Sequence, residues 1–156
     1  GFAADKLVKP EMLEEAAFKI EGVISTAHAA DATAPVAEAA APAAELPPIG
    51  PLLAAADPVK GQQVAKACAA CHDFTKDGPN KVGPNLWGVV GRARGAVAGY
   101  AYSMAMKTVG GEWTAEHLNA YLAKPRQAIP GNKMAYPGMA KLEDRAAVIA
   151  FLQSLK

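Results

Sequence analysis

The hydrophobic residues of this chain recur at helical spacing in its second half. Val148, Phe151, Leu152 and Leu155 follow the i, i+3, i+4, i+7 pattern, which predicts a helix over about 142–155 with one face turned towards a core. No segment alternates apolar and polar residues as a half-buried strand would. The pattern therefore predicts an all-α fold.

Two further helices are indicated by the residues that would start them. Thr114 is a suitable N-cap for a helix that ends before Pro125. Asp57 and Pro58 supply a second start, an N-cap followed by a first-turn proline, for a helix over 59–70.

Two stretches lack any helical periodicity. Residues 73–100 hold eight Gly and Pro residues, which predicts ordered loops. In residues 27–48, eleven of 22 residues are Ala and four are Pro, too little apolar surface to offset the entropy of ordering the segment. Within the preceding extension, Pro10 can start a short helix, either a solvated fragment or a docking segment for a partner. We predict an N-terminal extension (1–26), a flexible Ala/Pro-rich linker (27–50) and one domain (51–156).

Charge divides the chain at the same point. In total, 16 Lys and Arg against 15 Asp and Glu give a net charge of +1, but residues 1–50 carry −5 and residues 51–156 carry +6. An acidic tail before a basic domain indicates a charged partner. A length of 156 residues excludes a large multidomain enzyme. Nucleic-acid binding is disfavoured because the basic residues are not interleaved with stacking aromatics.

The hydropathy of the chain excludes a membrane span within it. No stretch approaches the roughly 20 consecutive apolar residues that a transmembrane helix needs, so we expect the chain as given to be soluble. It begins at Gly1 instead of Met, and we expect that an upstream segment was removed by processing or by design.

The residues that carry chemistry are Cys68, Cys71 and His72, in the sequence Cys-Ala-Ala-Cys-His. Two cysteines three positions apart share one helical surface, so both thiols can form thioethers to the vinyl groups at one edge of a porphyrin. The histidine then lies beneath the iron as its proximal ligand. A thioredoxin-like redox pair needs a preceding strand, and a zinc site needs about four ligands where only His28 and His117 remain. The motif predicts one covalently attached haem c.

A six-coordinate haem needs a second axial ligand, for which the chain offers five methionines. Met134 follows the turn 129–133, which can hold extended backbone against a haem face, so we predict Met134 as this ligand. The others lie beyond the linker, in a predicted helical turn, or at the start of the last helix, where packing is the expected role. They are Met12, Met104, Met106 and Met139.

Residues 57–156 resemble the class I cytochromes c, and among them the group that includes mitochondrial cytochrome c and the bacterial cytochromes similar to it. The resemblance implies the class I cytochrome c fold, in which N-terminal and C-terminal helices pack around the haem with long ordered loops. It rests on the Cys-Ala-Ala-Cys-His sequence, on Val-Gly-Pro-Asn-Leu-Trp-Gly-Val-Val-Gly-Arg at 82–92, on Tyr-Ala-Tyr-Ser at 100–103, on Trp113, and on Pro-Gly-Asn-Lys-Met at 130–134.

The same resemblance implies roles for single residues. Met134 would be the distal ligand, and Pro84 would accept a hydrogen bond from the ring of His72, which orients the imidazole. Three further residues match positions that hydrogen-bond or neutralise the haem propionates; they are Arg92, Tyr102 and Trp113. Trp87 is expected to form part of the pocket wall.

The chain departs from the family pattern in its first helix. The family usually has an aromatic residue four positions after the glycine of this helix, whereas Gly61 is followed at that distance by Ala65. We therefore expect Phe151 to pack with a different neighbour and the contact between the first and last helices to be looser.

With two axial ligands the iron has no open coordination site, which predicts a one-electron carrier and not an enzyme. A thioether ligand and an apolar pocket suit transfer from a quinol-oxidising cytochrome complex to a terminal oxidase, with docking through a basic face. The resemblance further implies the periplasmic side of a bacterial inner membrane, with the protein either soluble or tethered by an upstream N-terminal anchor. Two alternatives stay open: a haem domain built permanently into a respiratory complex, and a small haem peroxidase.

Overall fold

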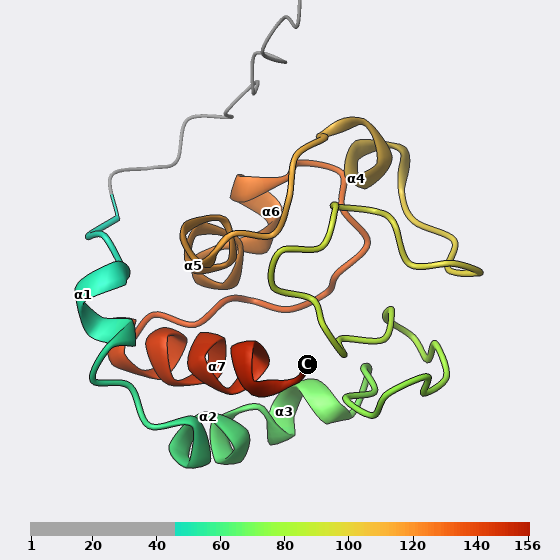
Figure 1. Cartoon of the computed structure of the whole chain (residues 1–156). Helices are drawn as coiled ribbons and strands as arrows, with labels where there is room; N and C mark the ends of the chain where they lie inside the picture. Colours follow the sequence, from blue (N-terminus) through green and yellow to red (C-terminus); the bar gives the residue numbers. More distant parts are fainter. Residues whose placement is uncertain (1–45) are drawn as a thin grey trace, which may run out of the picture. The chain divides into compact units, whose positions relative to one another are not determined.

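The computed structural model describes residues 46–156. The predicted extension (1–26) and residues 27–45 of the predicted linker lie outside this part. Within it, helices joined by long loops carry the fold (Figure 1), and the one β-type pairing is an isolated bridge between Ala93 and Glu112. The helices are α1 (Gly50–Leu53), α2 (Pro58–Val64), α3 (Lys66–Ala69), α4 (Met104–Thr108), α5 (Ala115–Ala123), α6 (Pro125–Ala128) and α7 (Leu142–Ser154). The all-α prediction is confirmed.

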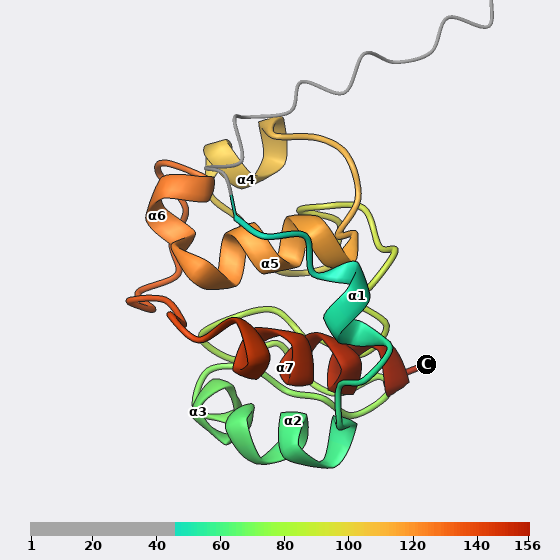
Figure 2. The ribbon, with the colours of Figure 1, turned by 90° about the vertical axis from the view of Figure 1, so that its left-hand side faces the viewer.

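Helix α7 lies between α5 and α2 in both views (Figures 1 and 2) and contacts each of them. The predicted C-terminal helix is confirmed to within one residue, and its buried face includes Val148, Phe151 and Leu152. The predicted caps are also present. The Asp57 carboxylate accepts from the N–H of Val59 at 2.7 Å, and the Thr114 hydroxyl accepts from the N–H of His117 at 3.2 Å.

The first predicted helix is broken into two. Helix α2 ends at Val64 and α3 begins at Lys66, and Ala65 between them is buried, with 1% exposed. No Gly or Pro interrupts 59–70 except Gly61, so the break has no local signal in the sequence. Its consequence is that α3 carries the first cysteine on a short separate turn.

Helices α2 and α7 meet closely at Gly61. A Cβ there would lie 1.9 Å from the carbonyl oxygen of Ala147, so the two backbones touch where a side chain would separate them. Phe151 packs edge-on against Phe74, with ring centroids 5.3 Å apart. The expected change of neighbour for Phe151 is confirmed, while the helix contact is close instead of loose.

The packed domain begins before the predicted boundary at residue 51. Residues 46–53, which we call the strap, include Ile49, fully buried at 0% exposure. The N–H of Ile49 donates to Glu116 Oε1 at 2.9 Å. The assignment of 47–50 to a flexible linker therefore needs correction, because contacts with distant residues order a segment whose local composition favours disorder. No helix within 46–156 is long and apolar enough to cross a membrane.

Candidate functional site

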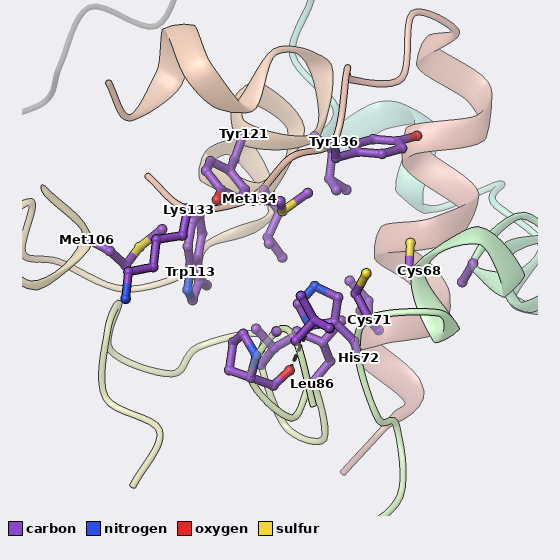
Figure 3. Close-up of a pocket in the computed structure, with 18 of the residues that line it drawn as sticks. Cys68, Cys71, His72, Leu86, Met106, Trp113, Tyr121, Lys133, Met134 and Tyr136 are labelled. Atoms are coloured by element: carbon purple, nitrogen blue, oxygen red, sulfur yellow. Dashed lines mark hydrogen bonds between the residues drawn. The ribbon is translucent and has the colours of Figure 1, made fainter. Parts of the chain in front are cut away.

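A cavity of about 280 Å³ lies between α3, α5, α7 and the loops around them, and its walls are mostly apolar (Figure 3). Leu86, Val89 and Leu122 come from different parts of the chain to form these walls. All eight predicted site residues line this one cavity: Cys68, Cys71, His72, Pro84, Arg92, Tyr102, Trp113 and Met134. Trp87 does not line it, so its predicted place in the wall is wrong.

The two cysteines lie at one side of the cavity, next to His72 (Figure 3). The backbone stays helical through this turn, since the N–H groups of Cys71 and His72 both donate to the carbonyl of Cys68, at 3.0 and 2.9 Å. Both thiols are free. Burial and the neighbouring Cys71 raise the pKa of the Cys68 thiol. The pair is placed as a two-point attachment to one edge of a ligand in the cavity.

The His72 ring is held in one tautomer. Its Nδ1 lies 2.7 Å from the carbonyl oxygen of Pro84, and because a carbonyl can only accept, Nδ1 carries the proton and Nε2 keeps its lone pair. Burial is the main cause that lowers the pKa of His72, which favours the neutral imidazole that a metal needs. Gly83 packs against the ring so closely that a Cβ there would lie 2.3 Å from Cε1.

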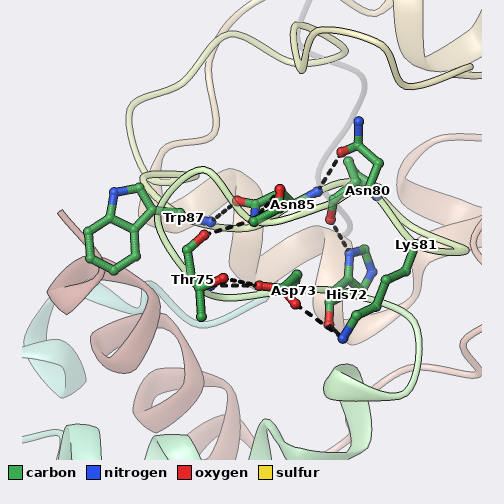
Figure 4. Close-up of polar contacts among 9 residues, drawn as sticks. His72, Asp73, Thr75, Asn80, Lys81, Asn85 and Trp87 are labelled. Carbon is green, nitrogen blue, oxygen red and sulfur yellow. Dashed lines mark hydrogen bonds and ion pairs between the residues drawn. The ribbon is translucent and has the colours of Figure 1, made fainter.

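The loop after His72 is closed by side-chain hydrogen bonds (Figure 4). Asn85, with 8% exposed, donates to the carbonyls of Thr75 and Gly78 at 2.9 and 3.2 Å. Its Oδ1 accepts from the N–H of Trp87 at 2.7 Å, and its own N–H donates to Asn80 Oδ1 at 3.0 Å. This network fixes the loop that carries Pro84, and sequence reasoning assigned no role to either asparagine.

A charged pair borders the same loop. Lys81 lies 3.3 Å from the Asp73 carboxylate and donates to the carbonyl of His72 at 3.3 Å. Hydrogen bonds from Thr75, together with Lys81, lower the pKa of Asp73 to about 2. The carboxylate therefore stays ionised at neutral pH beside the loop of the proximal histidine.

Met134 faces His72 across the cavity (Figure 3). Its N–H donates to Asn132 Oδ1 at 2.8 Å, and Asn132 Nδ2 donates to the carbonyls of Pro125 and Ile129 at 2.8 and 2.7 Å. Asn132 thus fixes the turn that presents the thioether. Tyr121 adds a fourth contact, with its hydroxyl 3.2 Å from Asn132 Oδ1.

The other methionines are placed less well to reach the space above His72. Met106 lines the cavity at the end away from the two cysteines, beside Trp113 (Figure 3). Met139 is buried in the core without lining the cavity, and Met104 is 74% exposed. Met12 lies outside the described residues.

Polar groups gather at the end of the cavity away from the cysteines. The Arg92 guanidinium donates to the carbonyls of Trp87 and Asn85, each at 2.9 Å, and burial lowers its pKa. Burial also raises the pKa of the Tyr102 hydroxyl, so that it remains a donor. Lys133 crosses this end and donates to the carbonyl of Ala101 at 2.7 Å. The Arg92 guanidinium, the Tyr102 hydroxyl and the indole of Trp113 are suited to bind carboxylates of a ligand at this end.

The residues present fit a haem. Two thiols at one edge, a neutral imidazole on one face, a thioether on the other and cationic groups at the far edge match the needs of a flat apolar macrocycle with two carboxylates. The absence of a side chain at Gly83 leaves the room that the imidazole of His72 occupies.

A family model described as cytochrome c matches residues 58–156. The chain is 45% identical to a cytochrome c homolog of Bradyrhizobium diazoefficiens over 156 residues, 99% of this chain and 81% of the relative. It is 44% identical over 108 residues to the cytochrome c-type cyt cy of Rhodobacter capsulatus, of which it covers 53%, and it covers 59% of a cytochrome c homolog of Rickettsia prowazekii. The solved structure of cytochrome cH from Methylobacterium extorquens superposes with a TM-score of 0.59 at 39% identity, over 63% of this chain and 98% of that one.

Proposed function

Because this chain belongs to the cytochrome c family, we propose that it carries single electrons from a quinol-oxidising cytochrome complex to a terminal oxidase. The family makes it a haem-based electron-transfer protein of the all-α class I fold, with one covalently bound haem c. The observation that carries the proposal is that His72 and Met134 face each other across one apolar cavity (Figure 3).

Each site residue has a place in this function. Cys68 and Cys71 would hold the haem through thioether bonds, and His72 Nε2 and Met134 Sδ would ligate its iron. Arg92, Tyr102 and Trp113 would face the propionates. When bound, the haem supplies an iron that takes up and gives up one electron.

The protein's own part is to keep this site the same in both oxidation states. Pro84 fixes the tautomer and orientation of His72, and Asn132 fixes the backbone of Met134. The mostly apolar walls would limit the contact of a bound haem with water. A small peroxidase would need an open position on the iron, and the placement of Met134 opposite His72 argues against one.

We propose that the partner is acidic and docks through lysines near the cavity mouth, among them Lys133, which lines the cavity. Val82 lines the cavity yet is 77% exposed, so it marks where the cavity meets the surface, with Lys81 next to it. An apolar centre with a cationic border suits brief, electrostatically steered encounters. The lysines expected to form the border are all exposed: Lys66, Lys76, Lys81, Lys124, Lys133 and Lys141.

The proposal extends to the compartment. We place the haem domain on the periplasmic side of a bacterial inner membrane, tethered through the residues that precede it. The Bradyrhizobium diazoefficiens relative shares the segment before the domain, since its similarity runs over 99% of this chain.

Reconstituted electron transfer tests the proposal. The reduced protein is mixed with membranes that contain a terminal oxidase, and the oxidised protein with membranes that contain a quinol-oxidising complex and quinol. We expect rapid oxidation in the first experiment and rapid reduction in the second, followed by the haem absorbance. Failure of either transfer would contradict the proposed partners, and fast peroxide turnover by the unmodified protein would favour the peroxidase alternative.

A further inference from the structure

The strap packs on α5 and α7, two helices that line the cavity, while no residue of the strap itself lines it. Ile49 is 0% exposed, and Leu52 and Leu53 pack against the same core. The strap runs along α5, and its helix α1 lies beside the ends of α5 and α7 (Figure 2). A segment of eight residues that includes three prolines and one glycine has little tendency to order by itself, so these contacts determine its position.

Two side chains one turn apart on α5 hold the backbone of the strap. Glu116 Oε1 accepts from the N–H groups of Ile49 and Gly50 at 2.9 and 3.2 Å. Asn119 Nδ2 donates to the carbonyl of Pro47 at 3.3 Å. Residues three apart share a helix face, so α5 grips the strap at two successive points.

Asn119 also connects the strap to the interior. It is 2% exposed, and its Oδ1 accepts from Arg145 Nε at 2.7 Å. Arg145 is itself 3% exposed and donates from Nη1 to the carbonyls of Met139 and Ala140, at 2.6 and 2.8 Å. One amide therefore bonds the strap with its donor end and a buried guanidinium with its acceptor end.

The guanidinium holds one end of the segment that presents Met134. At the other end, Asn132 Oδ1 accepts from the N–H of Met134. Met139 is further held by its N–H, which donates to the carbonyl of Leu122 at 2.8 Å. Gly138 packs so tightly that a Cβ would lie 2.1 Å from the carbonyl oxygen of Ala123. Because Arg145 holds residues 139 and 140, its hydrogen bonds affect how firmly the Met134 thioether is held in place.

We propose that the strap is a positioning element for the axial methionine, coupled to it through Asn119 and Arg145. The inference rests on the proposed role of Met134 as the distal ligand. The strap shields Asn119 from water. When the strap is loosened, water competes for the amide, the hold of Arg145 on residues 139–140 weakens, and the Met134 segment opens more often.

Competition at the iron measures this opening in the full-length ferric holoprotein. Imidazole is titrated against the unmodified protein and against the variants Ile49→Ala and Glu116→Ala, with visible absorbance as the readout. We expect imidazole to bind about fivefold more tightly in both variants. On heating either variant, we also expect the red charge-transfer band of the Met–iron bond to disappear at a lower temperature than the helical circular dichroism signal.

Matched controls separate coupling from general destabilisation. Val59→Ala trims an apolar side chain that is 62% exposed, and Gln62→Ala removes an exposed polar side chain from α2; neither should change imidazole affinity. Should Ile49→Ala fail to fold, Glu116→Ala at an exposed position still decides. Unchanged imidazole affinity in the strap variants would overturn the coupling. Absence of the Met–iron band in the unmodified protein would instead overturn the ligand role of Met134.

Discussion

The backbone at Gly83 shows how little room the site leaves around its proximal histidine. A Cβ at this position would lie 2.3 Å from His72 Cε1. Gly83→Ala should therefore displace the ring from Pro84 and lower the free energy of unfolding of the holoprotein by about 1–3 kcal/mol. Urea denaturation followed by the haem absorbance would measure it. Gly50→Ala, where nothing lies within 4 Å, is the control and should be nearly neutral; equal stability of the two variants would contradict the steric argument.

Met134 allows the axial ligand to be tested directly. Met134→Ala should leave the haem attached, because the thioethers from Cys68 and Cys71 do not depend on the sixth ligand, but it should abolish the Met–iron band of the ferric protein. Absorbance in the red measures the band, and a denaturing gel stained for haem measures attachment. Met106→Ala is the matched control, since Met106 also lines the cavity and should leave the band intact. The reverse result would move the ligand role to Met106.

At the scale of elements, the close crossing of α2 and α7 depends on Gly61. In Gly61→Ala the new Cβ would lie 1.9 Å from the carbonyl oxygen of Ala147. The two helices would have to move apart, which should lower the free energy of unfolding by about 1–3 kcal/mol. The loss would appear despite the better helix propensity of Ala, which favours the variant by about 1 kcal/mol at an exposed site. Chemical denaturation followed by circular dichroism measures it, with Gln62→Ala on the exposed side of α2 as the control. A more stable Gly61→Ala protein would show that the helices can separate at no cost.

The elements that could be predicted are those whose signals are local. The caps at Asp57 and Thr114 and the apolar face of α7 act within a few residues, so the sequence pattern contains them. The break at Ala65 has no Gly or Pro to signal it, and the ordering of Ile49 depends on Glu116, which is 67 positions away. A contact so far apart in the sequence leaves no periodic pattern, and the prolines on both sides of Ile49 favour disorder instead.

The candidate site divides in the same manner. The Cys-Ala-Ala-Cys-His residues are contiguous, so the sequence alone predicts haem attachment. The resemblance to the family predicted Pro84, Arg92, Tyr102 and Trp113, and all four line the cavity. Asn85 and Arg145 were missed because their partners are mostly backbone carbonyls. Any segment of the chain offers such carbonyls, so spacing alone cannot reveal these bonds.

At the scale of the whole molecule, the strap should contribute to stability as part of the domain. A chain of residues 46–156 keeps the strap, whereas a chain of residues 54–156 removes Ile49 and uncovers Asn119. Burial of one isoleucine side chain contributes about 1.5–3 kcal/mol, so the shorter chain should be less stable by at least about 1.5 kcal/mol. Denaturation of both holoproteins in urea measures the difference. Equal midpoints and slopes would show that the strap adds nothing to the fold.

The charge of the domain should govern how fast it meets its partners. Clustered positive charge steers an acidic partner, and the Debye length falls from about 30 Å at 0.01 M salt to about 10 Å at 0.1 M. Where encounter limits the rate, electron transfer should therefore slow by at least about tenfold as salt rises over this range. Lys76→Glu, Lys81→Glu and Lys133→Glu should slow it at low salt and flatten its dependence on salt, as measured by stopped flow with a purified quinol-oxidising complex or oxidase in detergent.

Lys107→Glu provides the matched control for these reversals. It changes the net charge by the same amount at an exposed position of α4 that does not line the cavity. Net charge acts through the electric field of the whole domain, so a general charge effect would lower the electron-transfer rate of all four variants alike. A docking contact acts locally, so docking at the cavity mouth would leave the rate of Lys107→Glu unchanged. Each variant must keep its Met–iron band, so that a lower rate reflects encounter and not a damaged site. A second-order rate that is unchanged by salt in the unmodified protein would contradict steering by this face.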